Sequence, residues 1–219
     1  MYQHRFATGS VPDLPPVPSK IVCVGQNYAD HIAEMGSNVA PEPMLFIKTA
    51  SCARPMEQPF GIPTGFGQCH FETEMSVLVG ARLSNATEAE ARSAMVGVGL
   101  AFDLTLRDLQ AELKSRGHPW EKAKGFDGSC PLSVFVPVPE NFQSLDLRLT
   151  RNDKLTQNGN TAQMLTQVVP LLAYASRFFT FEPGDVLLTG TPAGVGPLAS
   201  GDQLVAELGS ILRVQTRVQ

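Results

Sequence analysis

The chain has 219 residues, of which 43% are hydrophobic and 17% charged, and its formal net charge is −4. This composition excludes a disordered chain and predicts a globular protein with a core of its own. Lys and Arg total only 17 and form no basic block or basic helix face. Nucleic acid is therefore not expected as the main partner.

The cysteines, the N-terminus and the apolar segments bear on the cellular compartment. The four cysteines form no C-x-x-C pair and match no zinc motif, so we expect buried free thiols in a reducing environment. Residues 1–19 contain no apolar stretch of signal-peptide length. No apolar run approaches the roughly 18 residues of a membrane span. We therefore expect a cytoplasmic protein with no membrane partner.

The N-terminal part of the chain reads as a lead-in followed by short strands. Prolines dominate residues 1–19, which predicts an extended lead-in before a domain at 20–219. Residues 20–25 predict a buried strand, and 26–36 predict a short helix or turn closed by Gly36. Residues 43–48 predict a second strand.

The middle of the chain predicts strands alternating with capped helices. Residues 75–80 read as a strand, and Thr87 with Glu90 forms a capping box for a helix that ends near Met95. Residues 96–106 read as another strand. Thr105 and Asp108 repeat the capping signature, which predicts a helix to about Arg116 with Gly117 as its stop.

The C-terminal part predicts more strands and one long apolar helix. The helix begins at Asn160 or Thr161 and extends to about Phe179, and Pro170 should kink or divide it. The remaining segments predict strands at 144–150, 186–190, 200–208 and 211–218. Strands outnumber helices and do not alternate regularly with them, so a doubly wound parallel sheet is not expected. The pattern predicts an α+β protein, a mixed or antiparallel β-roll with flanking helices.

A pair of glutamates opens the strand at 75–80 and raises a chemical question. In a strand, residues two apart share a face, so Glu72 and Glu74 point the same way. Like charges this close repel, and in a poorly solvated site one carboxyl would take up a proton. A hard divalent cation such as Mg²⁺ removes that repulsion by accepting carboxylate oxygens.

A third acidic residue, Asp103, follows the strand at 96–102. By alternation it shares a face with Gly97, Gly99 and Ala101, where small side chains leave room. Three oxygen ligands favour Mg²⁺, Mn²⁺ or Ca²⁺ over zinc. A Glu-x-Glu pair is also common on solvent-exposed strand faces, so spacing alone leaves both interpretations open.

Six stretches together resemble one known family. They occur in order at 24–36, 43–48, 70–80, 101–110, 117–133 and 183–198. From about Lys20 to the C-terminus, the chain resembles the fumarylacetoacetate hydrolase family, in particular its short acylpyruvase and oxaloacetate decarboxylase-like branch. One departure is visible: relatives often have two histidines before the first glutamate, whereas this chain has His70 and Phe71.

The resemblance implies a fold, a cofactor and a partner. It implies the mixed β-sandwich roll of that family, a homodimer, and Mg²⁺ or Mn²⁺ held by the glutamate pair and the later aspartate. Those positions are Glu72, Glu74 and Asp103 in this chain. It further implies a 2-oxo or 2,4-dioxo acid as substrate, held as a chelate on the metal.

The remaining candidate residues come from residue chemistry together with the resemblance. His31 and Glu34 are three apart and can activate a water, although such a pair alone is more often a surface salt bridge. Arg107 can grip a substrate carboxylate, or it is a plain surface residue, and Gln110 can bond the same ligand. The resemblance selects Lys124 over Lys122 as the lysine that stabilises enolate charge.

The glycine-rich segment 189–197 needs a separate decision. It lacks the G-x-x-x-x-G-K-[ST] pattern, so we reject a phosphate-binding P-loop. Its backbone amides and the hydroxyl of Thr191 can instead hold a carboxylate.

The residues and the resemblance together give a ranked set of functions. The first is Mg²⁺- or Mn²⁺-dependent hydrolysis of the C–C bond of an acylpyruvate, such as acetylpyruvate or fumarylpyruvate, to pyruvate and a carboxylate. The alternatives in the same site are oxaloacetate decarboxylation and oxaloacetate keto–enol tautomerisation. A non-catalytic binding protein ranks last, because the chain retains both the ligand set and the candidate base.

Overall fold

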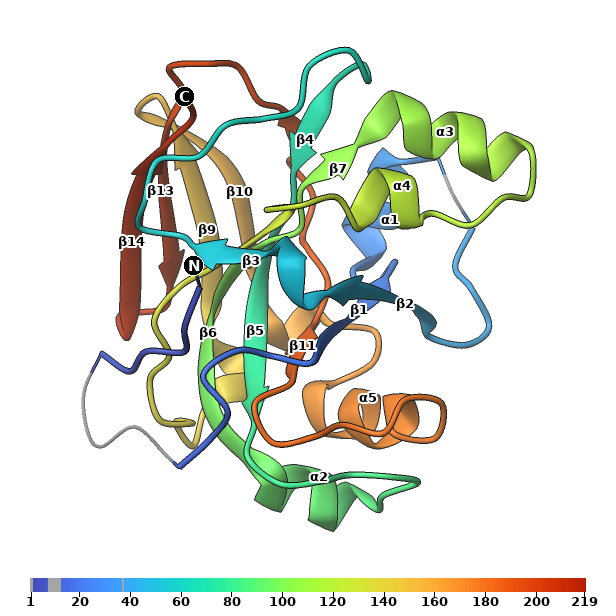
Figure 1. Ribbon diagram of the computed structural model, residues 1–219, viewed down its shortest axis with the longest axis vertical. Coiled ribbons are helices and arrows are strands. Elements are labelled where there is room, and N and C mark those ends of the chain that lie inside the picture. Colours follow the sequence, from blue (N-terminus) through green and yellow to red (C-terminus); the bar gives the residue numbers. More distant parts are fainter. Residues whose placement is uncertain (1, 8–12, 37) are drawn as a thin grey trace.

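The computed structural model describes residues 2–7, 13–36 and 38–219. Its largest sheet follows the order β2-β1-β11-β5-β6-β8-β3 (Figure 1). The strands are β1 (Lys20–Gly25), β2 (Met44–Thr49), β3 (Ala53–Pro55), β5 (Thr73–Val79), β6 (Met95–Phe102), β8 (Cys130–Leu132) and β11 (Val186–Leu188). The pairs β1–β11 and β3–β8 are parallel and the other pairs are antiparallel, so the sheet is mixed.

Two smaller sheets complete the fold. The four-stranded sheet, in the order β10-β9-β13-β14, consists of β9 (Asp146–Arg151), β10 (Lys154–Asn160), β13 (Gln203–Leu208) and β14 (Leu212–Arg217). The three-stranded sheet, in the order β12-β4-β7, consists of β4 (Cys69–Phe71), β7 (Thr105–Leu106) and β12 (Gly196–Pro197).

The helices are short and lie at the ends of the sheets. The α-helices are α1 (Ala29–Glu34), α2 (Glu88–Ala94), α3 (Arg107–Ser115), α4 (Glu121–Lys124) and α5 (Val168–Ala175). The 3₁₀ turns are Ala50–Cys52, Phe142–Ser144 and Thr161–Gln163. In Figure 1, α1, α3 and α4 gather near β2 and β7, whereas α2 and α5 pack together at the other end. The predicted mixed α+β roll with flanking helices is confirmed.

The core follows the two-residue period of the central strands. Val77 and Val79 of β5 belong to the larger apolar core, which also takes residues of the four-stranded sheet. Leu78, on the other face, belongs to a smaller core with Ile21 and Val186. Glu74 alternates onto the same face as Leu78. The smaller core therefore gives way to the acidic side chains toward the beginning of β5.

Several local predictions are confirmed. Thr87 and Glu90 form a reciprocal capping box at α2. Gly36 and Gly117 follow α1 and α3 with φ of 59° and 64°, a conformation that glycine adopts without a Cβ penalty. All four cysteines are buried and free.

Within the described residues, no helix combines the length and the apolar character needed to cross a membrane.

The predicted capping of α3 is wrong. Thr105 lies in β7 and Leu106 occupies the N-cap position without a side-chain hydrogen bond. Asp108 instead accepts a hydrogen bond from the backbone N–H of Gln68 at 2.8 Å. The hydroxyl of Thr105 donates to the carbonyl of Asp103 and accepts from Lys124, so the residue serves the site described below.

The predicted long helix from Asn160 to Phe179 is also wrong. Asn160 caps only a 3₁₀ turn, and α5 begins at Val168, which places Pro170 in its first turn without a kink. Proline has no N–H and fits the first turn, where no intrahelical partner is needed. The intervening segment bends instead of forming a helix, and the side chain of Asn27 bonds both the N–H and the carbonyl of Thr166 there.

The predicted lead-in is described at residues 2–7 and 13–19, and its residues 1 and 8–12 lie outside the described residues. Tyr2 and His4 are buried, and the Nε2 atom of His4 bonds the carbonyl oxygen of Gly184 at 2.8 Å. Phe6 forms a parallel bridge with Phe135. The division between lead-in and domain at residue 20 stays a prediction.

Candidate active site

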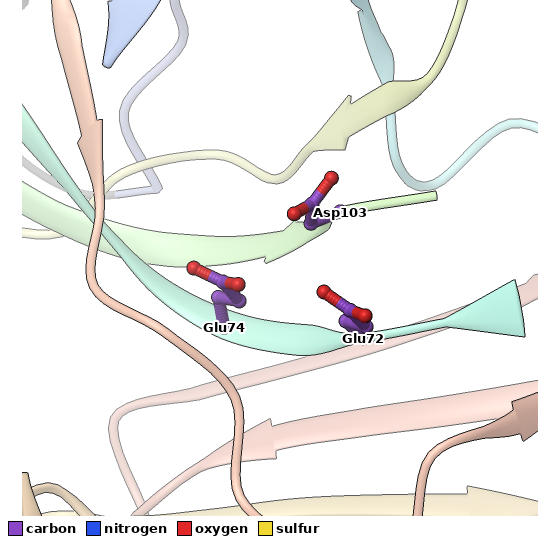
Figure 2. A group of neighbouring side chains, drawn as sticks. All are labelled: Glu72, Glu74 and Asp103. Carbon is purple, nitrogen blue, oxygen red and sulfur yellow. The ribbon is translucent and has the colours of Figure 1, made fainter. Parts of the chain in front are cut away.

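The three predicted acidic ligands converge at one end of the β5–β6 pair. Antiparallel pairing places Thr73 opposite Phe102, and the N–H of Asp103 donates to the carbonyl of Glu72 at 2.8 Å. Each of Glu72, Glu74 and Asp103 offers a carboxylate oxygen within 4.8 Å of the other two. Figure 2 shows the two glutamates side by side, Glu74 on β5 and Glu72 just before it, with Asp103 opposite them just after β6.

The cluster is buried and surrounded by cations. Glu72 is 6% exposed, and Glu74 and Asp103 are each 1% exposed. The Nζ atom of Lys124 lies 2.8 Å from Oε2 of Glu72 and 2.6 Å from Oδ2 of Asp103. Lys48 lies 2.8 Å from Oδ1 of Asp103, and Arg107 pairs with Glu72. Three carboxyl groups thus lie beside three cationic side chains, which pair with Glu72 and Asp103.

The pKa values of the two glutamates diverge in opposite directions. Burial raises the pKa of Glu74 well above its ordinary value, and the charges of Asp103 and Glu72 raise it further. Burial also acts to raise the pKa of Glu72, but the Lys124 ammonium and the Arg107 guanidinium outweigh it and hold that pKa below its usual range. Burial opposes the charge of Lys124, yet Asp103 and Glu72 raise its pKa. Glu74 is therefore the carboxyl whose charge is least compensated.

These residues fit a hard divalent cation. All three candidate ligands are oxygen donors, which suit Mg²⁺, Mn²⁺ or Ca²⁺. The raised pKa of Glu74 marks a place where additional positive charge would be stabilising. One oxygen of Glu74 already accepts the backbone N–H of Gly190 at 2.6 Å, which fixes its carboxylate in place. The carboxylate triad can bind a divalent metal.

Lys48 is a site residue that the sequence prediction missed. It is fully buried, and besides Asp103 it donates to the carbonyl oxygens of Lys124 and Ser129. Strand alternation gives only part of the signal: it places Lys48 on the same face of β2 as Phe46, but not beside Asp103. A pocket opens beside the acidic cluster, and Phe46 lines it together with Glu72, Glu74 and Asp103. A fully buried lysine requires a negative partner, which here is Asp103.

His31 and Glu34 lie together at the pocket wall, as their spacing predicts. The Nδ1 atom of His31 is 3.1 Å from Oε2 of Glu34, and His31 is 8% exposed. His31 lines the pocket, whereas Glu34 stands behind it and accepts the N–H of Gly194 at 3.0 Å. With Nδ1 held by a carboxylate, the tautomer with a free Nε2 is favoured, and that nitrogen can accept a proton.

Arg107 and Gln110 begin α3 beside the acidic cluster, and both line the pocket. The Nη1 atom of Arg107 donates to Oε1 of Gln110 at 2.8 Å while Nη2 pairs with Glu72. The Nε atom of Arg107 is buried and has no hydrogen-bond partner among the described residues. The two residues are placed together next to the candidate metal ligands.

Thr191 lines the pocket, but its hydroxyl is already occupied. It donates to the carbonyl of Thr73 and accepts from Nε2 of Gln157, both at 2.8 Å. Gln157 is fully buried on β10 and also accepts the N–H of Thr73. Sequence reasoning missed this glutamine, because nothing local in β10 indicates which loop it contacts. A substrate-binding role for Thr191 stays a prediction.

The departure at Phe71 affects packing. Phe71 is 1% exposed in the larger core and pairs with Gly196 of β12. The guanidinium carbon of Arg151 lies 5.9 Å from its ring centroid. Phe71 does not line the pocket, although it directly precedes Glu72.

Comparison with known proteins agrees with this architecture. The family profile described as "Fumarylacetoacetate (FAA) hydrolase C-terminal" matches residues 20–219. The chain belongs to the fumarylacetoacetate hydrolase family. Among its relatives, oxaloacetate tautomerase YcgM of Escherichia coli K12 is 54% identical over 207 residues, which cover 93% of this chain and 94% of the relative.

Two crystal structures show the same fold. A fumarylacetoacetate hydrolase family protein of Yersinia pestis superposes with a TM-score of 0.95 at 51% identity, covering both chains completely. Fumarylpyruvate hydrolase of Pseudomonas aeruginosa, solved with Mn²⁺ and pyruvate, superposes with a TM-score of 0.91 at 29% identity, covering 99% of this chain and 94% of that one. Members of this family thus include both hydrolases and tautomerases.

Proposed function

We propose that this protein is an oxaloacetate keto–enol tautomerase that depends on a divalent metal. The observation that carries this choice is the 54% identity with a relative named oxaloacetate tautomerase over nearly the whole of both chains. It supports tautomerisation, one of the alternatives ranked on sequence alone, better than acylpyruvate hydrolysis. Tautomerisation needs a place for an anion, a base and a cation beside the reacting oxygen, and we assign these roles to residues of the pocket.

Glu72, Glu74 and Asp103 would hold the metal, with Mg²⁺ or Mn²⁺ as the preferred ions. When bound, such an ion polarises the 2-oxo group and makes the neighbouring C3–H more acidic. The charge balance supports a dianionic substrate. Because the three carboxylates face three cations, a dication leaves a charge that matches the two carboxylates of oxaloacetate.

The proton transfer falls to His31 in this proposal. Its free nitrogen takes the proton from C3, and Glu34 fixes the ring and stabilises the imidazolium that forms. Lys124 stabilises the negative charge that develops on the C2 oxygen through its own positive charge, because its three N–H donors are held by Glu72, Asp103 and Thr105. His31 then returns the proton to that oxygen, so the protein ends in its starting state and oxaloacetate has become its enol.

Arg107 and Gln110 position the substrate. Their side chains stand at the pocket wall beside Glu72. The guanidinium of Arg107 can pair with a carboxylate, and the amide of Gln110 can bond the same group. We assign the carboxylate next to the 2-oxo group to this pair.

Hydrolysis of an acylpyruvate is the second candidate. Its support is the fumarylpyruvate hydrolase neighbour at 29% identity and the His31–Glu34 pair, which can also activate a water. In that reaction the water attacks the distal carbonyl and the C–C bond breaks to release pyruvate enolate. Oxaloacetate decarboxylation would pass through the same enolate.

The homodimer implied by the family resemblance also stays a prediction.

The experiment that tests the proposal follows enol-oxaloacetate by ultraviolet absorbance after mixing with Mg²⁺-loaded protein. The enol signal should decay to its equilibrium level far faster than in buffer, with no stoichiometric release of pyruvate or CO₂. EDTA-treated protein should lose this acceleration, and added Mg²⁺ should restore it. Decay no faster than in buffer would rule out a tautomerase, and prompt pyruvate release from acetylpyruvate or fumarylpyruvate would favour the hydrolase.

A further inference from the structure

Helix α3 carries a row of polar side chains along the pocket. Arg107, Gln110 and Lys114 stand at positions i, i+3 and i+7, which share one face of a helix. All three line the pocket. Arg107 marks the inner end of this row, since it pairs with Glu72. Lys114 therefore marks the outer end.

Among the residues that the structure describes, Lys114 differs from the other basic side chains of the pocket, His31, Arg107 and Lys124, in having no ion pair. Lys124 is bound to Glu72 and Asp103, Arg107 to Glu72, and His31 to Glu34. Among the residues that the structure describes, Lys114 forms no salt bridge and no side-chain hydrogen bond. Its positive charge at the pocket is therefore available to a ligand.

An aromatic wall separates Lys114 from the acidic cluster. Its ammonium nitrogen lies 5.7 Å from the ring centroid of Trp120, and that ring lies 6.1 Å from Phe46. The ring of Phe46 is in turn 5.2 Å from the Nζ atom of Lys124. Two ammonium groups thus stand at opposite ends of a wall formed by two aromatic rings. Stacking on Trp120 favours a Lys114 side chain that stays at the pocket.

The rest of the outer pocket offers little else to a charged ligand. Met35, Met44, Phe46 and Trp120 line it with apolar surface. A ligand held by Arg107 and the acidic cluster would extend between these side chains toward Lys114. An anionic group at its far end would meet a single cation there.

We propose that Lys114 binds the distal carboxylate of the substrate and so selects 2-oxo dicarboxylates over 2-oxo monocarboxylates. The inference rests on the proposed function for the identity of the substrate, but it concerns binding. It also bears on the second candidate, because fumarylpyruvate carries a distal carboxylate and acetylpyruvate does not. Lys114 is a specificity-determining residue in this account, and it takes no part in the proton transfer.

The test compares two ligands of almost identical shape. Oxaloacetate and its 4-amide, 2-oxosuccinamate, differ only in the charge of the distal group. Their dissociation constants are measured by isothermal titration calorimetry on Mn²⁺-loaded wild type and on three variants: Lys114→Gln, Lys114→Arg and Lys122→Gln. Lys122 is the matched control, because it is a nearby lysine, exposed on α4, that does not line this pocket.

We expect wild type to prefer oxaloacetate to the amide by about tenfold, the effect of a hydrogen bond to a charged group that solvent partly screens. Lys114→Gln should bring this ratio close to one by weakening oxaloacetate alone. Lys114→Arg should retain most of the preference, and Lys122→Gln all of it. Equal affinities in wild type, or a ratio unchanged by Lys114→Gln, would overturn the proposal.

The same measurements separate this inference from the proposed function. If Mn²⁺-loaded wild type discriminates between the two ligands but does not accelerate enol decay, the Lys114 subsite is supported and the tautomerase function is refuted. If it accelerates enol decay without discriminating between the ligands, the tautomerase function is supported and the Lys114 subsite is refuted. Thermal unfolding of each variant checks that the fold is intact.

Discussion

Lys48 places its ammonium nitrogen 2.8 Å from Oδ1 of Asp103, and its side chain has no exposed surface. Each charge compensates the other in a region that water does not reach. The same ammonium also donates to backbone carbonyls of Lys124 and Ser129, so it ties the candidate ligand to the segment that carries Lys124. The position of Asp103 therefore depends on a residue of another strand.

Replacing Lys48 with Met should destabilise the protein by about 3–5 kcal/mol, because it leaves the Asp103 charge buried without this partner. Urea unfolding of the metal-free variant measures the free energy. The double variant Lys48→Met/Asp103→Asn is the control. Asp103→Asn should cost less in that background than in wild type, since the charge it removes has already lost one partner. Additive effects would show that the ion pair contributes little.

The raised pKa of Glu74 predicts how the stability of EDTA-treated protein depends on pH. The native state keeps a proton on Glu74 above the ordinary value of 4.5, whereas the unfolded chain releases it. The contribution of Glu74 to the free energy of unfolding is thus fully present below about pH 4.5, and it is lost as the pH rises through the raised native pKa. Urea unfolding at a series of pH values measures this slope.

The variant Glu74→Gln isolates that contribution. It cannot ionise, so its stability without metal should fall less over the same pH range, and at pH 8 it should exceed wild type in EDTA. Mn²⁺ should stabilise wild type and leave the variant nearly unaffected. Parallel pH profiles for the two proteins would contradict the assignment.

His31 and the metal ligands should be separable by mutation. His31→Ala should reduce the tautomerisation rate by about 10²–10⁴-fold, the usual contribution of a general base. Its Mn²⁺ affinity should stay within twofold of wild type, because His31 is no ligand in this account. Steady-state rates and a metal titration on the same preparation give both quantities, and full turnover without His31 would refute the role assigned to it.

Gly194 should be needed for more than its backbone conformation. Its φ is +97°, and a Cβ would lie 1.9 Å from the carbonyl oxygen of Thr156. Gly201 has a φ of +93° but open space around it, so it is a matched control. Gly201→Ala should cost about 1–2 kcal/mol from backbone strain alone.

Gly194→Ala should cost clearly more, and it should also lower the tautomerisation rate, because the N–H of Gly194 holds Glu34 against His31. Urea unfolding and rate measurements on both variants provide the comparison. Equal destabilisation, with no effect on the rate, would mean that the loop adapts and does not support the histidine.

Much of the candidate site was predictable because it follows local rules. Two-residue alternation places Glu72 and Glu74 on one face, and the position of Asp103 after a strand with small residues brings it to the same end. The capping box at Thr87 needs only residues three apart. The His31–Glu34 pair lies within one turn of helix.

The rest depended on contacts between distant segments. Thr105 has the residue type of a helix cap, but its hydroxyl bonds Lys124, which the local pattern cannot indicate. Asn27 bonds Thr166 in the bend before α5, although that segment follows an apolar helical pattern. Lys48 became interpretable only when its strand was seen beside Asp103. In each case a tertiary hydrogen bond or ion pair decided the outcome.

The central claim is that three buried carboxylates bind one divalent cation, and a Mn²⁺ titration followed by electron paramagnetic resonance tests it most directly. EDTA-treated wild type should take up one Mn²⁺ per chain, and Glu72→Gln, Glu74→Gln and Asp103→Asn should each weaken that binding at least tenfold. Absence of Mn²⁺ uptake by wild type, or uptake that survives all three substitutions, would contradict the account.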